Sequence, residues 1–170
     1  MDLIEYKLWP SGNQTWRVNG VYHRLDGPAI ITTAGDREWH IMGQRHRLDG
    51  PAVEYSDGSV EYYQNGLLHR EDGPAFIDCY GNKMWYLHGE EHRVGGPAIE
   101  YTNGEVEYFY RGHLHRLDGP AVTYVDGKHL WFIHDHNITQ AVLTWMQENS
   151  ITYPFTPNVQ LEFLLRFAHE

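Results

Sequence analysis

Hydrophobic and polar positions in residues 51–73 form two short runs separated by a turn. Residues 52–55 and 60–64 are rich in β-branched and aromatic side chains, which favour strands. Asp57-Gly58 stands between the runs. Such a pair is a strong β-hairpin signal because glycine accepts the positive φ of a tight turn. The pattern predicts a β-hairpin, followed by a second reversal at Asn65-Gly66.

The same pattern returns every 23 residues. The sequence His-Arg-x-Asp/Gly-Gly-Pro-Ala begins at His23, His46, His69, His92 and His115. An aromatic side chain keeps the same spacing at Trp16, Trp39, Tyr62, Trp85, Tyr108 and Trp131. A fixed period between about 20 and 50 residues is typical of repeat proteins, whose units stack on their neighbours. We predict six units: 5–27, 28–50, 51–73, 74–96, 97–119 and 120–142.

The predicted fold is mainly β. It is an elongated single-layer antiparallel sheet of six 23-residue β-hairpin repeats in residues 1–138, capped by two C-terminal α-helices in residues 139–170. Thr139 is expected to cap a helix that ends at about residue 149, and Thr156-Pro157 to begin a second one. Terminal units of repeat arrays need a cap. Both helices are interpreted as a cap, the alternative being that one face of the second helix is also left for a partner or a second copy of the chain. Phe163 and Phe167 in that helix are candidate protein-binding residues.

Composition limits the classes of function. The chain has 13 Lys and Arg against 23 Asp and Glu, a formal charge of −10, which disfavours direct binding to nucleic acid or anionic lipid. Cys79 is the one cysteine, so no intrachain disulfide forms. The N-terminal residues do not resemble a signal peptide, and no apolar run approaches the roughly 18–20 residues of a membrane span. We expect a cytoplasmic protein with no membrane partner.

Two rows of equivalent positions have different characters. The aromatic row from Trp16 to Trp131 is constant, and we interpret it as a ladder that buttresses each hairpin, the alternative being an exposed binding strip. The next position points to the opposite face of the strand. It changes from polar to apolar along the chain, and its candidate protein-binding residues are Tyr63, Tyr86, Phe109 and Phe132. A large apolar patch should be covered, and we expect the C-terminal segment to cover it.

The motif side chains are interpreted as structural. They are His23, Arg24, Asp26, His46, Arg47, Asp49, His69, Arg70, Asp72, His92, Arg93, His115, Arg116 and Asp118. An active site normally occurs once rather than in five copies, and Asp before Gly suits a turn in which Arg can pair with it. No nucleophile elbow, phosphate loop or dinucleotide fingerprint is present. We therefore expect no enzymatic activity and no cofactor.

Twelve histidines raise the question of a metal. The repeat histidines are expected about 10 Å apart, from two strand spacings per repeat, which is too far to share one ion at the zinc–ligand distance. His134 and His136 form the best local pair. We prefer the interpretation that these are surface histidines and expect no metal site.

The repeat resembles a known family. Tyr62-x-x-Asn65-Gly66-x-x-His69 and Trp16-x-x-Asn19-Gly20-x-x-His23 are similar to MORN repeats, and the resemblance covers residues 5–142. The chain departs from that pattern in having His-Arg-x-Asp-Gly-Pro-Ala where His-Gly-x-Gly is usual. This variant resembles repeats of bacteriophage and large DNA virus proteins. The resemblance implies a scaffold or binding surface, while the lipid binding proposed for the family does not suit so acidic a chain.

Three hypotheses of function follow. The first is a non-catalytic viral protein that binds, and by binding inhibits, a host protein of defence or nucleic-acid processing. The second is a structural or self-assembling scaffold, including a homodimer through the C-terminal helices. The third is a protein that sequesters a small ligand or nucleotide in an aromatic groove, where rings can stack on bases.

Overall fold

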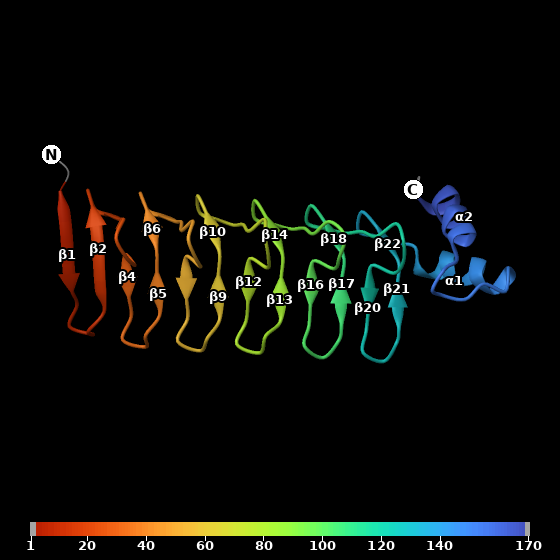
Figure 1. Ribbon diagram of the computed structural model, residues 1–170, viewed down its shortest axis with the longest axis horizontal. Coiled ribbons are helices and arrows are strands. Elements are labelled where there is room, and N and C mark those ends of the chain that lie inside the picture. The colour runs from red at the N-terminus through yellow and green to blue at the C-terminus, as the bar shows by residue number, and fades with distance from the viewer. Residues whose placement is uncertain (1–2, 169–170) are drawn as a thin grey trace. The chain divides into compact units, whose positions relative to one another are not determined.

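The computed structural model describes residues 3–168, which divide into two compact units, Met1–Glu90 and Glu91–Glu170. The predicted mainly β chain of antiparallel hairpins followed by two C-terminal helices is confirmed (Figure 1). The boundary predicted between residues 138 and 139 stays a prediction.

The first unit opens with the antiparallel pair β1 (Ile4–Leu8) and β2 (Gln14–Val18), in which Tyr6 lies opposite Trp16. Two-residue strands follow: β3 (Val21–Tyr22), β4 (Ile30–Ile31), β5 (Arg37–Glu38), β6 (His40–Ile41), β7 (Gln44–Arg45), β8 (Val53–Glu54), β9 (Val60–Glu61), β10 (Tyr63–Gln64), β11 (Leu67–Leu68), β12 (Phe76–Ile77), β13 (Lys83–Met84) and β14 (Tyr86–Leu87), with β15 (Glu90–Glu91) at the division. The order in the sheet of this unit is β1-β2-β4-β5-β8-β9-β12-β13.

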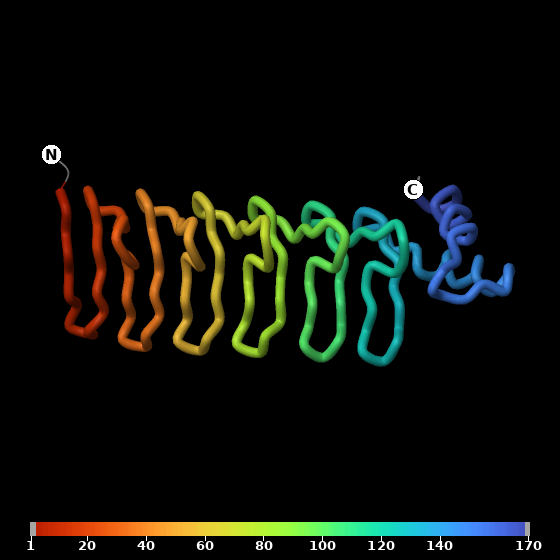
Figure 2. The backbone as a smooth tube through the Cα atoms, viewed as in Figure 1, coloured from red at the N-terminus to blue at the C-terminus, as the bar shows by residue number. Residues whose placement is uncertain are grey.

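Each repeat of the first unit contains two hairpins of different size. A main hairpin such as β8–β9 joins the sheet, and a small one such as β10–β11 stands beside it as a separate pair of strands. In Figure 2 the closed ends of the main hairpins follow one edge of this unit and the small hairpins follow the other. The small turn has φ of 51° at Asn65 and 81° at Gly66. Positive φ at both central residues is the geometry of a type I′ turn, which matches the twist of the strands.

The second unit contains β16 (Ile99–Glu100), β17 (Val106–Glu107), β18 (Phe109–Tyr110), β19 (His113–Leu114), β20 (Val122–Thr123), β21 (His129–Leu130), β22 (Phe132–Ile133) and β23 (His136–Asn137), followed by α1 (Thr139–Glu148) and α2 (Pro157–Phe167). Its small hairpin β22–β23 forms although Asp135 replaces the turn glycine, with φ of 66°. The Asp135 carboxylate accepts hydrogen bonds from the Leu114 N–H at 2.7 Å and pairs with His113 at 2.6 Å. These bonds hold a turn that lacks glycine.

Helix α1 begins differently from the prediction. Thr139 is its first residue and Ile138 precedes it without a side-chain cap. The Thr139 hydroxyl oxygen instead accepts a hydrogen bond from the Trp131 N–H at 3.0 Å, so it joins the helix to the last strand. Helix α2 begins as expected, because the Thr156 side chain accepts from the Val159 N–H with Pro157 at the first helical position.

The core differs between the repeats and the C-terminus. Each repeat from the second to the sixth has one fully buried alanine of the motif, and these are Ala29, Ala52, Ala75, Ala98 and Ala121. In the second unit both helices pack on Trp131 and Ile133 in one cluster, with Ile138, Val142, Trp145, Phe163 and Phe167. The helices therefore cover the aromatic ladder of the last repeat. Phe132, which the C-terminal segment was expected to cover, is half-buried and lies outside this cluster.

Candidate functional site: the arginine clip and its grooves

The arginine of the motif is held by its own repeat and by the first residue of the next. In the third repeat, the Arg70 guanidinium carbon lies 4.0 Å from the centroid of the Tyr62 ring, a cation–π distance. Its Nε donates to Asp72 at 2.8 Å, and its Nη1 donates to the Pro74 carbonyl at 3.4 Å. A Cβ on Gly73 would lie 3.0 Å from the guanidinium carbon. Arg70 thus packs against the Gly73 backbone, and a larger residue at position 73 would have to displace the guanidinium.

We call this arrangement the arginine clip: an arginine stacked on the ladder ring, bonded to the motif Asp and proline carbonyl, and packed on the motif glycine. Guanidinium-to-ring distances are 4.0 Å for Arg24 on Trp16, 4.0 Å for Arg47 on Trp39 and 3.8 Å for Arg116 on Tyr108. The Arg–Asp bonds in these clips are 2.8 Å, 3.0 Å and 2.5 Å. In each of these motifs the arginine and the aspartate thus stabilise the turn to which they belong.

The fourth motif lacks the aspartate because Gly95 takes its place. Arg93 still donates to the Pro97 carbonyl at 3.1 Å, and it pairs with Glu100 at 2.5 Å. Gly95 has a φ of 79°, which suits glycine better than aspartate. The second motif makes the equivalent bond from Arg47 to Glu54 at 3.1 Å in addition to its bond to Asp49, so the fourth motif keeps the bond to the following strand and lacks only the one to the motif Asp.

The clip sets the electrostatics of the turn. Hydrogen bonding to Arg24 holds the pKa of the Asp26 carboxyl below its ordinary value, and Arg47 and Arg70 do the same for Asp49 and Asp72. These carboxylates lie almost entirely in solvent beyond the one oxygen that the arginine binds. Each turn therefore presents an ionised, accessible carboxylate.

Sequence reasoning missed the variable residue x of the motif. Leu25 is 79 % exposed, Leu48 77 % and Val94 83 %. The sequence contained a signal for this position, because x is Leu, Leu, Glu, Val and Leu in the five copies. The side chain is therefore aliphatic in all copies but the third. We call Leu25, Asp26, Leu48 and Asp49, all in the first unit, the turn row.

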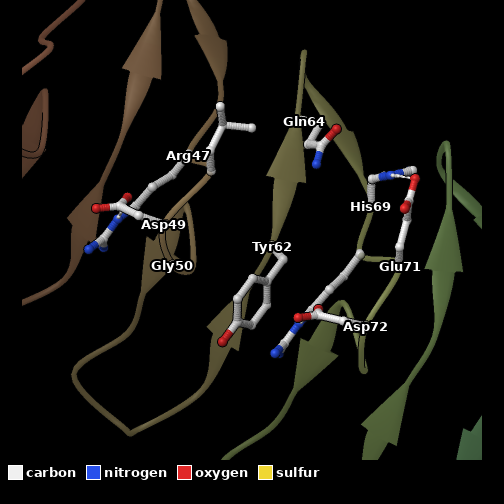
Figure 3. A pocket seen from close by; sticks show the side chains of 10 residues that line it. Arg47, Asp49, Gly50, Tyr62, Gln64, His69, Glu71 and Asp72 are labelled. Carbon is white, nitrogen blue, oxygen red and sulfur yellow. Dashed lines mark hydrogen bonds and ion pairs between the residues drawn. The ribbon is translucent and has the colours of Figure 1, made fainter.

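Grooves separate neighbouring clips in the first unit. One of about 480 Å³ is lined by the Arg24 and Arg47 turns and Trp39, and one of about 520 Å³ by the Arg47 and Arg70 turns and Tyr62. Figure 3 shows the second groove, where the Tyr62 ring lies between Asp49 on one side and Asp72 on the other. Leu25 and Leu48 line these grooves. The ladder ring forms a floor bordered by aliphatic and acidic side chains.

The equivalent surface of the last motif, in the second unit, is partly covered, whereas Val94 of the same unit is exposed. Leu117, equivalent to Leu25, is only 38 % exposed. The Gln160 side chain of α2 donates a hydrogen bond to the Leu117 carbonyl at 2.5 Å. A Cβ on Gly119 would lie 2.8 Å from the Tyr153 hydroxyl, which packs there. A helix of the chain therefore already contacts one copy of the motif turn.

The candidate binding residues of the opposite face are half-buried, and one of them is hydrogen-bonded within the chain. Tyr63 is half-buried, and its hydroxyl accepts from the Arg45 guanidinium at 3.3 Å. Burial raises the Tyr63 pKa. Tyr86, Phe109 and Phe132 are also half-buried, so none of these four is a freely projecting ring.

Phe163 and Phe167 need a correction as candidate binding residues. They are 0 % and 3 % exposed and belong to the core cluster, because this side of α2 packs on Trp145. The apolar side chains that α2 presents to solvent are Leu161 and Leu165.

Metal-binding geometry does not occur in the part of the chain that the structure describes, residues 3–168, where no three His, Cys, Asp or Glu side chains converge. The His134 ring lies 4.1 Å from the His115 ring, centroid to centroid, and the backbone N–H of His134 donates a hydrogen bond to His115 Nδ1. His136 is exposed. His134 therefore stacks within the array.

Comparison with protein-family models and with curated protein sequences finds no match. Within residues 3–168, neither helix has the length and apolar character needed to cross a membrane.

Proposed function

We propose that this chain is a non-catalytic, protein-binding repeat protein whose first unit receives a helix of its partner on the turn row and grooves. One observation carries the proposal. In the second unit α2 docks on the equivalent motif turn through Gln160 and Leu117, while Leu25 and Leu48 in the first unit stay exposed. The motif turn that contacts a helix at Leu117 is open at Leu25 and Leu48.

The spacing of the turn row suits a helix. Equivalent positions are two strands apart, or about 10 Å from strand separations of 4.7–4.9 Å. Seven residues of α-helix advance about 10.5 Å and return to nearly the same face. In an extended strand, a residue three positions further along lies at a similar distance, but its side chain points to the opposite face. A heptad-spaced helix therefore matches the row better than an extended peptide.

Charge complements this geometry. Asp26, Asp49 and Asp72 remain ionised and project beside the exposed aliphatic positions, and the chain carries a formal charge of −10. A partner helix with aliphatic and basic residues repeated every seven positions would meet both. The carboxylates that border the grooves disfavour the binding of a phosphate group there, which argues against the hypothesis of nucleotide sequestration. The motif's resemblance to repeats of bacteriophage and large-virus proteins supports a host protein, inhibited by this contact, as the partner.

Affinity purification with matched variants tests the proposal. Wild-type protein should retain one specific protein from host lysate, and that protein, once purified, should bind directly with an affinity that falls as salt rises. The double variant Leu25→Ser, Leu48→Ser should lose binding. Val125→Ser, which changes an exposed aliphatic residue of a main-hairpin turn in the second unit, should retain it. Recovery of no specific protein, or equal binding by both variants, would refute the proposal.

A further inference from the structure

Strand β1 (Ile4–Leu8) forms an open edge. It pairs with β2 on one side and, within residues 3–168, with no strand on the other. Ile4 is 77 % exposed, Tyr6 56 % and Leu8 60 %. Natural edge strands are usually blunted by proline, a bulge or charge, because unpaired backbone groups can pair with another chain. Residues 4–8 contain no proline and run in unbroken register with β2.

The pairing with β2 shows which backbone groups are free. The Asn19 N–H donates to the Leu3 carbonyl at 2.9 Å, and the Trp9 N–H donates to the Asn13 carbonyl at 2.9 Å. Bonded residues alternate along an antiparallel strand. Glu5 and Lys7 therefore direct their backbone groups at β2, and Ile4, Tyr6 and Leu8 direct theirs outward. Three N–H groups and three carbonyls face the open side.

We propose that β1 pairs antiparallel with β1 of a second copy of this chain, about a twofold axis at Tyr6. The segment Ile4-Glu5-Tyr6-Lys7-Leu8 has mirror-like character about its centre: apolar, acidic, aromatic, basic, apolar. In this register Tyr6 meets Tyr6 of the second copy, and Ile4 meets Leu8. All three outward-facing residues form hydrogen-bonded pairs, which gives six backbone bonds.

Charge selects this register. Glu5 lies opposite Lys7 of the second copy, and Lys7 opposite Glu5, in the non-hydrogen-bonded positions where side chains approach most closely. A slip of two residues one way places Glu5 opposite Glu5, and a slip the other way places Lys7 opposite Lys7. A slip of one residue leaves the outward N–H and carbonyl groups without partners. The centred register alone satisfies both the backbone and the charges.

Apolar packing favours the same pair. Ile4, Tyr6 and Leu8 share the face on which the Tyr6 ring lies 5.0 Å from Trp16. Pairing would bring the same three side chains of the second copy beside them and withdraw exposed apolar surface from water. The contact is small, so we expect a concentration-dependent dimer rather than an obligate one. This dimer does not depend on the partner surface proposed above.

Sedimentation velocity over a concentration series tests the dimer with a charge-swap set. Wild type should dimerise. Glu5→Lys and Lys7→Glu should each weaken the dimer about tenfold or more, because each turns two opposite-charge pairs into like-charge pairs. The double variant E5K/K7E restores opposite charges and should recover the wild-type constant. Recovery would distinguish pairing from the loss of the Lys7–Trp9 contact, in which the ammonium lies 3.4 Å from the ring centroid.

The alternative contact is tested in parallel. Leu161→Glu with Leu165→Glu changes the exposed apolar residues of α2 and should leave the dimer intact. Circular dichroism of every variant checks that it is folded. A wild-type monomer at all concentrations, a dimer insensitive to the single charge reversals, or one lost only in the α2 variant would each overturn the proposal.

Discussion

The ring nitrogen Nδ1 of His46 accepts a hydrogen bond from the backbone N–H of Asn65, 19 residues later, at 3.1 Å. The same bond joins His23 to Met42, His69 to His88, His92 to Arg111 and His115 to His134, at 3.0, 3.1, 3.2 and 3.2 Å. A nitrogen that accepts cannot carry a proton. Each motif histidine thus holds the next small turn only while its imidazole is neutral.

Acid should therefore loosen the small turn that His115 holds. Burial, and after it the neighbouring His134, lowers the pKa of His115 from its ordinary value of 6.5. A depressed histidine pKa means that folding favours the neutral ring. Its contribution is fully present above about pH 6.5 and is lost as pH falls through the lower folded-state pKa. We expect the free energy of unfolding, measured by urea titration, to fall across this window.

A substitution at His115 checks the cause. His115→Asn removes the titrating group and should flatten the pH dependence, whereas His136→Asn, at an exposed position, should leave it unchanged. An unaltered pH profile for His115→Asn would contradict the argument. Carboxylates with lowered pKa, such as Asp36, bonded to Ser56 and Thr32, lose their contribution only at lower pH, below about 3.8.

The arginine clip should matter more through stacking than through its ion pair. Arg70→Ala removes the Tyr62 contact and the bond to Pro74, and we expect it to cost about 1–2 kcal/mol. Asp72→Gly introduces the glycine of the fourth motif, although Ile77 stands where that motif has Glu100, and it should cost about 0.5 kcal/mol or less because an exposed ion pair contributes little. Urea denaturation of both variants provides the comparison. Equal losses would show that the ion pair dominates.

The motif glycine should be coupled to the clip. Gly73→Ala places a Cβ 3.0 Å from the Arg70 guanidinium carbon, and we expect a loss of about 1–3 kcal/mol from overpacking. In the Arg70→Ala background the obstruction is absent, so the same change should be nearly neutral. A double-mutant cycle measures this coupling. Additive losses would mean that Arg70 is not what disfavours a side chain at position 73.

The helical cap should depend on the buried side of α2. Phe163 is fully buried among Trp145, Phe155 and Phe167, and Phe163→Ala is expected to cost about 3–5 kcal/mol. Leu165, exposed on the same helix, should tolerate alanine within about 0.5 kcal/mol. Hydrogen exchange of the α1 and α2 amides should increase in the first variant and not in the second. Similar protection in both would contradict the role of Phe163.

The local elements followed from the sequence because their causes are local. Asn65-Gly66 predicts its turn, since positive φ is needed at both positions, and Thr156-Pro157 predicts the start of α2. The start of α1 did not follow, because Thr139 has a partner in Trp131, eight residues earlier, that competes with the capping role. The use of Asp135 in place of glycine likewise depends on His113 and Leu114 in the preceding hairpin.

The sequence by itself determined the 23-residue period, the hairpins and the two C-terminal helices, because turn chemistry and the alternation of side chains act over a few residues. Only the tertiary structure decided that the motif arginine stacks between a ring and a glycine, that Phe163 is buried while Leu25 is exposed, and that β1 is an open edge. Those outcomes depend on which side chains meet across repeats, and burial and pairing between distant residues are not encoded in any short segment.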